Sequence, residues 1–294
     1  MKKLAIIIPA YKAMYLESTL NSFVSQTESN FNIYIGDDNS PEDIYSIVEK
    51  FRHKLNIEYI KFEENIGSKS LTKQWERCVE MSNEEWIWLF SDDDIASPYC
   101  VEVFYKTVNN DSKFYKFHTS IIDGKGIDIR SDRKPVNKVG NYITSQDYID
   151  KRLDARGFRS FAVEYIFHRS LYDRLKFVDF PMAWASDDGS WLIYSLQNSK
   201  IITILDEKVF WRLSSSNISS KNSDDIMVSK KIIASINFIN WLRPYNSIDL
   251  IALDESKMLR WLSIQIASLE YSLSYHDYKE IIKDANISAS NAVV

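Results

Sequence analysis

Short apolar runs alternate with amphipathic segments through the first hundred residues, and this alternation restricts the fold more than any other feature. Four runs have the length of buried strands: Leu4–Ile8, Phe31–Gly36, Ile57–Phe62 and Trp86–Phe90. Between them, apolar residues recur three or four positions apart, as in helices that pack one face on a sheet. The sequence therefore predicts an α/β fold with a mainly parallel sheet flanked by helices.

The three helices expected between these strands contain Leu16, Ile44 and Leu71. Ser40 has the character of an N-cap for the second helix, with Pro41 in its first turn and Asp43 completing a capping box. The apolar run that follows Met1-Lys2-Lys3 stops after five residues, at Pro9. This run predicts a buried first strand and not a signal peptide.

Beyond residue 100 the alternation is looser. The polar stretch 123–140 is expected to be a surface excursion, and the serine-rich stretch 214–223 a mobile loop. Three further strands and three helices are expected: strands at Val163–Phe167, Ile201–Leu205 and Val209–Leu213, a helix that opens at Ser186-Asp187-Asp188, and helices at Ile226–Leu242 and Leu250–Leu273 that are separated at Arg243-Pro244.

Charge and composition exclude several classes of protein. The chain has 36 basic and 41 acidic residues, so no basic surface is expected for a nucleic-acid partner. Glycine-rich phosphate loops of the dinucleotide and P-loop types are missing among seven glycines. Cys78 and Cys100 are expected to be reduced, packed thiols. No apolar run reaches about 18 residues, which predicts a cytoplasmic protein, at most peripheral to a membrane.

Carboxylates follow two of the four expected strands, at the edge of the sheet where ligands bind in such folds. Asp37 and Asp38 come after the second strand, and Asp92, Asp93 and Asp94 come after the fourth. Three adjacent carboxylates repel one another unless water, donors or a cation neutralises them. Mg²⁺ or Mn²⁺ suits such oxygen ligands, with substrate phosphates completing its shell. Solvated loop and cap residues are the alternative interpretation.

Four segments in order, IIIPAYK, IGDDNS, N-x-G and WIWLFSDDDIASP, resemble the successive signatures of family 2 glycosyltransferases with the GT-A fold. The resemblance covers residues 4–98 and extends more weakly to about residue 217. It implies that Ala10, Tyr11 and Asp38 contact the base and ribose of a nucleotide-sugar. The family's D-x-D-D motif, anchored on Pro98, places its first aspartate at Ser91.

At Ser91 the sequence departs from that motif, and the resemblance implies that Asp92 takes over the ribose contact. It makes Asp93 the first candidate metal ligand and Asp94 the second. A further segment, Trp184–Trp191, is similar to the family's acidic pair before a helix, in which the second acid is the catalytic base. This implies Asp188 as the base and Asp187 as the structural member of the pair. Helix capping without catalysis is the alternative for both residues.

The resemblance divides the chain into a nucleotide-sugar-binding half (1–98), an acceptor and catalytic-base half (99–223) and a C-terminal helical region (224–294). It implies an inverting, metal-dependent transferase, most often with a UDP-sugar donor and a saccharide or lipid-linked saccharide acceptor, in surface polysaccharide synthesis. A non-catalytic nucleotide-sugar-binding or assembly protein is the alternative. The C-terminal helices are expected to pack on the core, with a dimer face or a membrane contact as alternatives.

Two further sets of residues have open interpretations. Trp184, Trp191 and Trp211 offer flat faces to acceptor sugars, or belong to the core. Arg212 and Lys221 flank the serine-rich stretch, which either closes over the diphosphate or is a solvated surface loop.

Overall fold

A computed structural model describes residues 4–109, 111–131, 142–154, 158, 160–198, 200–214, 217, 225–247, 250–270, 276, 279–280 and 283. The described strands belong to one sheet: β1 (Leu4–Ala10), β2 (Phe31–Asp37), β3 (Ile57–Lys61), β4 (Trp86–Leu89), β5 (Ile95–Ala96), β6 (Phe114–Ile122), β7 (Asp128–Ser131), β8 (Tyr142–Thr144), β9 (Tyr165–His168) and β10 (Lys200–Arg212). Their order is β3-β2-β1-β4-β9-β6-β10-β5, with β7 beside β6 and β8 beside β10.

The first four strands are parallel, as the alternating sequence pattern predicts. Residue Leu4 of β1 lies opposite Phe31 of β2 on one side and Trp86 of β4 on the other. Beyond β4 the sheet is mixed, because β9 runs antiparallel between β4 and β6. One continuous sheet therefore joins the two halves of the chain.

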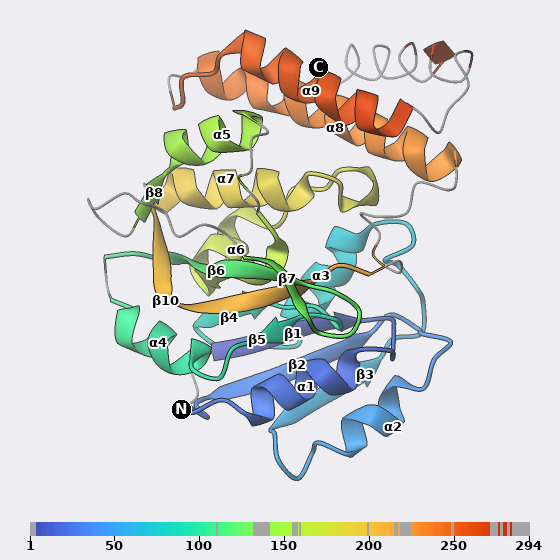
Figure 1. Ribbon diagram of the computed structural model, residues 1–294, viewed down its shortest axis with the longest axis vertical. Helices are drawn as coiled ribbons and strands as arrows, with labels where there is room; N and C mark the ends of the chain where they lie inside the picture. Colours follow the sequence, from blue (N-terminus) through green and yellow to red (C-terminus); the bar gives the residue numbers. More distant parts are fainter. Residues whose placement is uncertain are drawn as a thin grey trace.

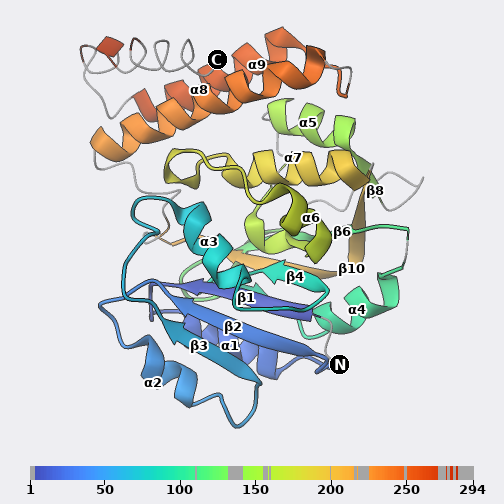
Figure 2. The same ribbon diagram turned by 180° about the vertical axis from the view of Figure 1, so that it is seen from behind.

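Helices cover both faces of the sheet: α1 (Leu16–Val24), α2 (Ile44–Glu49), α3 (Leu71–Val79), α4 (Cys100–Thr107), α5 (Ser145–Asp154), α6 (Arg169–Leu175), α7 (Ser186–Asn198), α8 (Asp225–Ser247) and α9 (Glu255–Glu270), with short 3₁₀ turns η1 (Ala162–Glu164) and η2 (Pro181–Ala183). Figure 1 shows α1 and α2 on one side of the sheet and α7, α5, α8 and α9 stacked in succession on the other. Figure 2 shows α3 and α6 on this second side, from behind.

Side chains of β1 alternate between two cores, one on each face of the sheet. Ile6 and Ile8 pack with the core that contains α1, α2 and α4, whereas Ala5 and Ile7 pack with the core below α3, α6 and α7. A strand buried on both faces must be apolar at every position, which explains the unbroken apolar run in the sequence.

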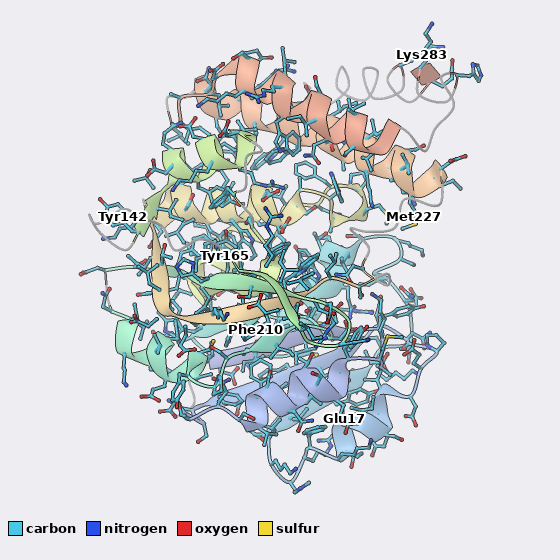
Figure 3. All side chains as sticks on the ribbon, in the orientation of Figure 1. Glu17, Tyr142, Tyr165, Phe210, Met227 and Lys283 are labelled. Atoms are coloured by element: carbon cyan, nitrogen blue, oxygen red, sulfur yellow. The ribbon has the colours of Figure 1, made fainter. Side chains whose placement is uncertain are left out.

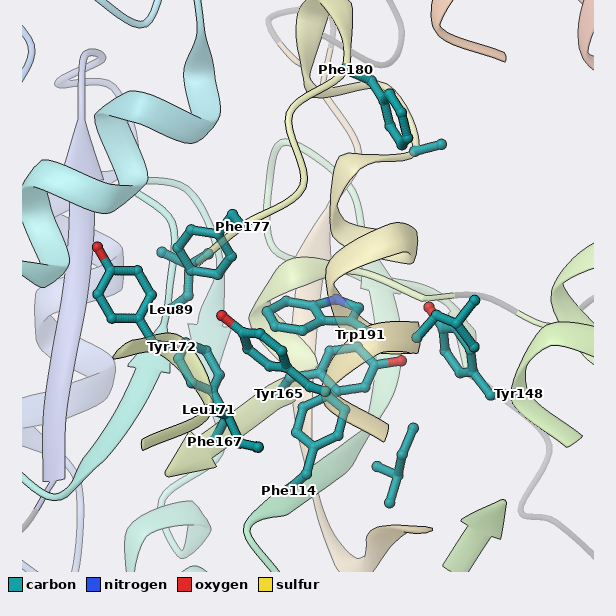
Figure 4. Packing of buried hydrophobic residues seen from close by; sticks show 14 of the residues in the cluster. Leu89, Phe114, Tyr148, Tyr165, Phe167, Leu171, Tyr172, Phe177, Phe180 and Trp191 are labelled. Atoms are coloured by element: carbon teal, nitrogen blue, oxygen red, sulfur yellow. The ribbon is translucent and has the colours of Figure 1, made fainter. Parts of the chain in front are cut away.

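The second core is built around Trp191 of α7, which is fully buried. Its indole ring stacks on Tyr165 of β9, with ring centroids 4.8 Å apart, and lies beside Phe114 of β6 (Figure 4). With all side chains drawn, Tyr165 lies between the sheet and the helices, whereas Glu17 lies at the outer side of α1 (Figure 3).

Helices α8 and α9 share this second core. Phe238 of α8 and Trp261 of α9 are fully buried, and their ring centroids lie 5.2 Å apart. Phe238 also contacts Phe180, which precedes η2, at 6.0 Å. In the described residues, the C-terminal helices therefore pack on the rest of the fold, as expected from their apolar positions.

Two expectations about helix ends are wrong. The sequence predicts that Pro244 breaks a helix, but α8 continues through it to Ser247. Pro244 has no N–H to donate to the carbonyl group of Asn240, so one hydrogen bond of the last turn is lost, but the helix continues for three more residues. The N-cap of α2 is Asp43, whose carboxylate accepts from the N–H of Ser46 at 3.0 Å, and not Ser40. Ser40 instead donates its hydroxyl to the carbonyl of Tyr11 at 2.6 Å.

Three other segments differ from the expectations in detail. The two strands expected at 201–205 and 209–213 form one strand, β10, with a shift of register between Ile204 and Lys208. The strand expected from Val163 begins at Tyr165, because residues 162–164 form the turn η1. Within the stretch 123–140, residues 128–131 pair with β6 as β7, and residues 132–140 lie outside the described part.

Cys78 and Cys100 are buried free thiols, as predicted. Burial raises the pKa of the Cys100 thiol to about 12. Within the described ranges, no helix combines the length and the apolar character needed to cross a bilayer.

Candidate active site

A cavity of about 640 Å³ opens at the carboxyl ends of β1, β2 and β4. Its lining brings together the segments after these strands with η1, η2 and the start of α7. Among the predicted site residues it is lined by Tyr11, Asp38, Asp92, Asp93, Asp94 and Asp188. A cavity of this size suits a small organic ligand.

Asp92 fixes the segment that follows β1. Its Oδ2 atom accepts hydrogen bonds from the backbone N–H groups of Tyr11, at 2.8 Å, and Lys12, at 2.9 Å. The side chain of Tyr11 remains 41% exposed beside the cavity. Ala10 is only 1% exposed and belongs to the core, and its carbonyl accepts from the N–H of Asp38 at 2.9 Å. The structure thus places Ala10 behind the cavity wall.

Asp94 is held through both carboxylate oxygens. Its Oδ1 atom accepts from the backbone N–H of Arg212 at 2.8 Å, and its Oδ2 atom accepts from the hydroxyl of Ser91 at 2.6 Å. The same hydroxyl lies 2.9 Å from Asp93 Oδ1. Ser91, which replaces the first aspartate of the family motif, therefore bridges the two acids that follow it.

Arg212 is fixed under the acidic segment and is only 2% exposed. Its guanidinium group donates to the carbonyl groups of Asp93 and Asp123, at 2.8 and 3.0 Å. Most of the serine-rich stretch that follows Arg212, residues 215–216 and 218–223, lies outside the described residues. Lys221 lies outside the described residues.

The acidic segment resists ionisation. Burial, followed by the neighbouring Asp93, raises the pKa of Asp92 and of Asp94, and burial also raises the pKa of Asp93. Asp93 is the least buried of the three. A positive charge at this position would remove much of the repulsion between these groups.

Asp38 holds the Asn65-Ile66-Gly67 turn at the cavity edge. Its Oδ1 and Oδ2 atoms accept from the N–H groups of Ile66 and Gly67, each at 2.9 Å, and Arg77 forms an ion pair with Oδ1. A Cβ atom at position 67 would collide with Asp38 Oδ2, which explains the glycine. Burial raises the pKa of Asp38 despite these donors.

Asp188 lies in the first turn of α7 and is 2% exposed. Its Oδ1 atom forms an ion pair with Arg152 Nε at 2.7 Å and accepts from the hydroxyl of Tyr148 at 3.3 Å. Among the described residues its Oδ2 atom has no hydrogen-bond partner. Since Asp188 lines the cavity, this oxygen is the one available to a ligand.

Asp187 also lines the cavity and is more exposed than Asp188. Burial, followed by the negative charge of Asp188, raises the pKa of Asp187. The two neighbouring acids therefore have different surroundings, because Asp188 forms the ion pair with Arg152.

Tyr148 and Arg152 are site residues that the sequence analysis missed. Both belong to α5, four positions apart and hence on one face, and Arg152 lines the cavity. The Tyr148 hydroxyl also lies 3.2 Å from that of Ser160, which lies 2.8 Å from that of Tyr165. The helical spacing of Tyr148 and Arg152 could be seen in the sequence, but it does not indicate that Asp188 is their common partner.

Aromatic side chains form a further part of the cavity wall. Trp211 lines it and stacks on Phe161, with centroids 4.4 Å apart and rings inclined by 9°. Trp184 lines it as well and donates its indole N–H to Ser235 of α8 at 3.1 Å. Trp191, in contrast, is fully buried in the core, so an acceptor-stacking role is wrong for this residue.

In the part of the chain that the structure describes, no three His, Cys, Asp or Glu side chains converge as a complete metal-binding group. The donor set nevertheless fits a hard divalent cation, because Mg²⁺ and Mn²⁺ are often bound by one or two carboxylates and the phosphates of a substrate. Asp93 is the carboxylate with the most exposed position for this purpose.

Comparison with known sequences finds a matching family model and similar curated proteins. The family model described as Glycosyl transferase family 2 matches residues 5–174. Over 97 residues, 32% of the chain, the sequence is 30% identical to the poly(ribitol-phosphate) beta-N-acetylglucosaminyltransferase TarS of Staphylococcus aureus (strain Mu50 / ATCC 700699). The chain covers 17% of the length of the curated TarS relatives that it matches.

Solved structures show the same fold. TarS residues 1–349 of S. aureus in complex with UDP-GlcNAc superpose with a TM-score of 0.59 and 17% identity, over 92% of this chain and 73% of that chain. The mannosyltransferase PcManGT from Pyrobaculum calidifontis, in complex with GDP-Man and Mn²⁺, gives a TM-score of 0.54 and 12% identity, over 97% and 80% of the two chains. These similarities confirm the predicted GT-A type fold.

Proposed function

We propose that this chain, which belongs to glycosyltransferase family 2, moves a sugar from a nucleotide-sugar to a hydroxyl group of a saccharide acceptor, with inversion at the anomeric carbon. The observation that carries this proposal is a single cavity lined by both Asp93 and Asp188. A leaving diphosphate needs compensation of its charge, and an attacking hydroxyl needs a base. The two acids would serve these needs from opposite halves of the chain.

The donor is proposed to lie in the half formed by residues 1–98. Tyr11, Asp38 and Asp92 are assigned to the base and ribose, with Asp92 also holding the backbone of Tyr11 in place. A UDP-sugar is the first candidate donor, since solved TarS structures contain UDP or UDP-GlcNAc. Ala10 would contribute only through its backbone, because its side chain belongs to the core.

Asp93 is proposed as the main ligand of a divalent cation, Mg²⁺ or Mn²⁺, which when bound would stabilise negative charge on the diphosphate. The similar structure of PcManGT contains Mn²⁺ together with GDP-Man. Asp94 remains the second candidate ligand, because each carboxylate oxygen has a second lone pair beyond the bonds to Ser91 and Arg212.

Asp188 is proposed as the general base, in the acceptor half formed by residues 99–223. Its Oδ2 atom would take the proton of the acceptor hydroxyl while the hydroxyl oxygen forms the new bond to the anomeric carbon and the nucleoside diphosphate leaves. Arg152 and Tyr148 would orient the carboxylate through Oδ1. A β-linked product follows from an α-linked donor. Surface polysaccharide synthesis is the proposed setting, with a free or lipid-linked saccharide as acceptor.

Two isosteric substitutions test the base. Asp188→Asn should lose on the order of 10²–10⁴ in turnover with nucleotide affinity close to that of the wild type, and Asp187→Asn should lose less. A thermal-shift screen of nucleotide-sugars with and without Mn²⁺ first identifies the donor, and slow hydrolysis of that donor then serves as an assay without an acceptor. Wild-type turnover by Asp188→Asn would move the base to Asp187. A wild-type protein that binds the donor and neither hydrolyses nor transfers it would favour a non-catalytic binding protein.

A further inference from the structure

A second cavity, of about 460 Å³, lies beside the active-site cavity. The two share four lining residues: Gly67, Ser68, Leu71 and Met182. Met182 lines the active-site cavity together with Asp188, the proposed base, so the shared wall belongs to the same cavity as the base. The two cavities are therefore adjacent along these four residues.

The second cavity has an excess of positive charge. Lys69 and Lys230 both line it, and within the described residues neither ammonium group has an ion pair or a hydrogen bond. The opposing carboxylate is Asp179, whose oxygens accept from the hydroxyl groups of Ser70, at 3.0 Å, and Thr72, at 2.5 Å. Among the described lining residues, two lysines therefore stand against one carboxylate, which already accepts from two hydroxyl groups.

The wall between the cavities is a constrained segment. Met182, Ala183 and Ala185 have φ values of 61°, 52° and 63°, a left-handed conformation that costs about 1 kcal/mol or more for each residue without a glycine. Two hydrogen bonds hold the segment. The N–H of Phe180 donates to the hydroxyl of Ser186 at 2.8 Å, and the indole N–H of Trp184 donates to the hydroxyl of Ser235 in α8. Such a conformation is maintained by its surroundings and gives the wall a definite shape.

We propose that the second cavity binds an anionic group of the acceptor, a phosphate or a carboxylate, through Lys69 and Lys230. The acceptor hydroxyl would lie at Asp188, and the chain would continue past Met182 into the second cavity. Ammonium groups bind such anions as point charges. This inference rests on the proposed transfer reaction and adds to it the class of acceptor: a saccharide that carries a negatively charged group.

Binding of two anionic probes tests the subsite. Isothermal titration calorimetry is performed with saturating UDP and Mg²⁺ in excess of total phosphate, using a short polyphosphate and an oligogalacturonate as probes and a neutral maltooligosaccharide as the uncharged comparison. The variant is Lys69→Met/Lys230→Met. The matched control is Lys50→Met/Lys54→Met, which makes the same change of charge at the end of α2, outside both cavities. Thermal unfolding confirms that both variants are folded.

The expected result is that at least one anionic probe binds the wild type and the control equally, and that its affinity falls at least about tenfold in the Lys69 and Lys230 variant, equivalent to about 1.4 kcal/mol. Preference for polyphosphate or for oligogalacturonate identifies the anion as phosphate or carboxylate. Equal affinity in the variant, or no binding of either probe to the UDP-saturated wild type, would each overturn the inference. Failure of the wild type to bind UDP would instead count against the proposed function.

Discussion

Gly67→Ala is a sharp test of the donor half, because the structure allows no space for a methyl group at this position. The added Cβ would collide with Asp38 Oδ2, which already accepts from the N–H of the same residue. No positive φ is involved at this glycine, so the cost arises from the collision alone. The carboxylate must therefore move away from the Ile66 and Gly67 amide groups.

The expected loss follows from these hydrogen bonds. A hydrogen bond to a charged group contributes about 1.5–3 kcal/mol, and partial relaxation of the turn should leave a net loss of about 2–3 kcal/mol. Since the entropy of unfolding is about 2.1 cal/mol/K per residue, a chain of 294 residues should lose about 3–5 °C in Tm. UDP affinity should fall about tenfold, because Asp38 is displaced from the proposed base-binding position.

Differential scanning calorimetry and UDP titration provide the assay. Gly124→Ala is the matched control: its Cβ would meet only the terminal hydroxyl oxygen of Tyr15, at 3.0 Å, which can move aside. A second control is Gly67→Ala in an Asp38→Ala background, where the obstacle is gone and the substitution should cost under about 0.5 kcal/mol. The reasoning fails if Gly67→Ala costs the same with and without the Asp38 carboxylate.

Three further perturbations test the rest of the molecule. Treatment with EDTA and the substitution Asp93→Asn should each weaken nucleoside diphosphate binding in calorimetry, and undiminished affinity in both would exclude the metal role. The pKa of Asp187 is raised in the folded protein, so ionisation of this carboxyl group destabilises the wild type as pH rises from about 5 to about 9. Asp187→Asn lacks the ionisable group, and its Tm should therefore rise relative to that of the wild type over this range. Equal pH profiles of Tm would contradict this. Truncation after residue 223 removes Phe238 and Trp261 from the core and should give an insoluble product, so a monodisperse, active truncation would contradict the packing.

The parallel half of the fold and the place of its carboxylates follow from local patterns in the sequence. Strand β1 must be apolar at every position because both faces are buried, and the same holds for β4 before Asp92. Ligand-binding residues after such strands share one edge, so their gathering at one cavity follows once the strands are found. The acidic pair at the start of α7 is located through its resemblance to the family motif before a helix, and the structure confirms the helix start.

Contacts between distant segments could not be predicted from the sequence. Periodicity places Tyr148 and Arg152 on one helical face, but their partner Asp188 belongs to another helix. Trp184 and Trp191 have the same side chain but different surroundings. Trp184 precedes α7 and lines the cavity, whereas Trp191 points inward from α7 and belongs to the core. The helix α8 likewise continues through Pro244, although proline removes one hydrogen bond there, and local sequence alone predicts a break at this residue.

The hydrogen bond from the N–H of Arg212 to Asp94 has a consequence for synthesis of the chain, because its partners are 118 residues apart. At about 5–20 residues per second, a ribosome adds β10 roughly 6–24 s after the acidic segment has been made. During that interval β5 lacks its pairing partner in the sheet, and Asp94 lacks one of its two donors. A nascent chain that ends before β10 therefore has strands β1 to β4 without the final geometry of the acids that follow β4, and the proposed nucleotide binding would stabilise the protein only late in its synthesis.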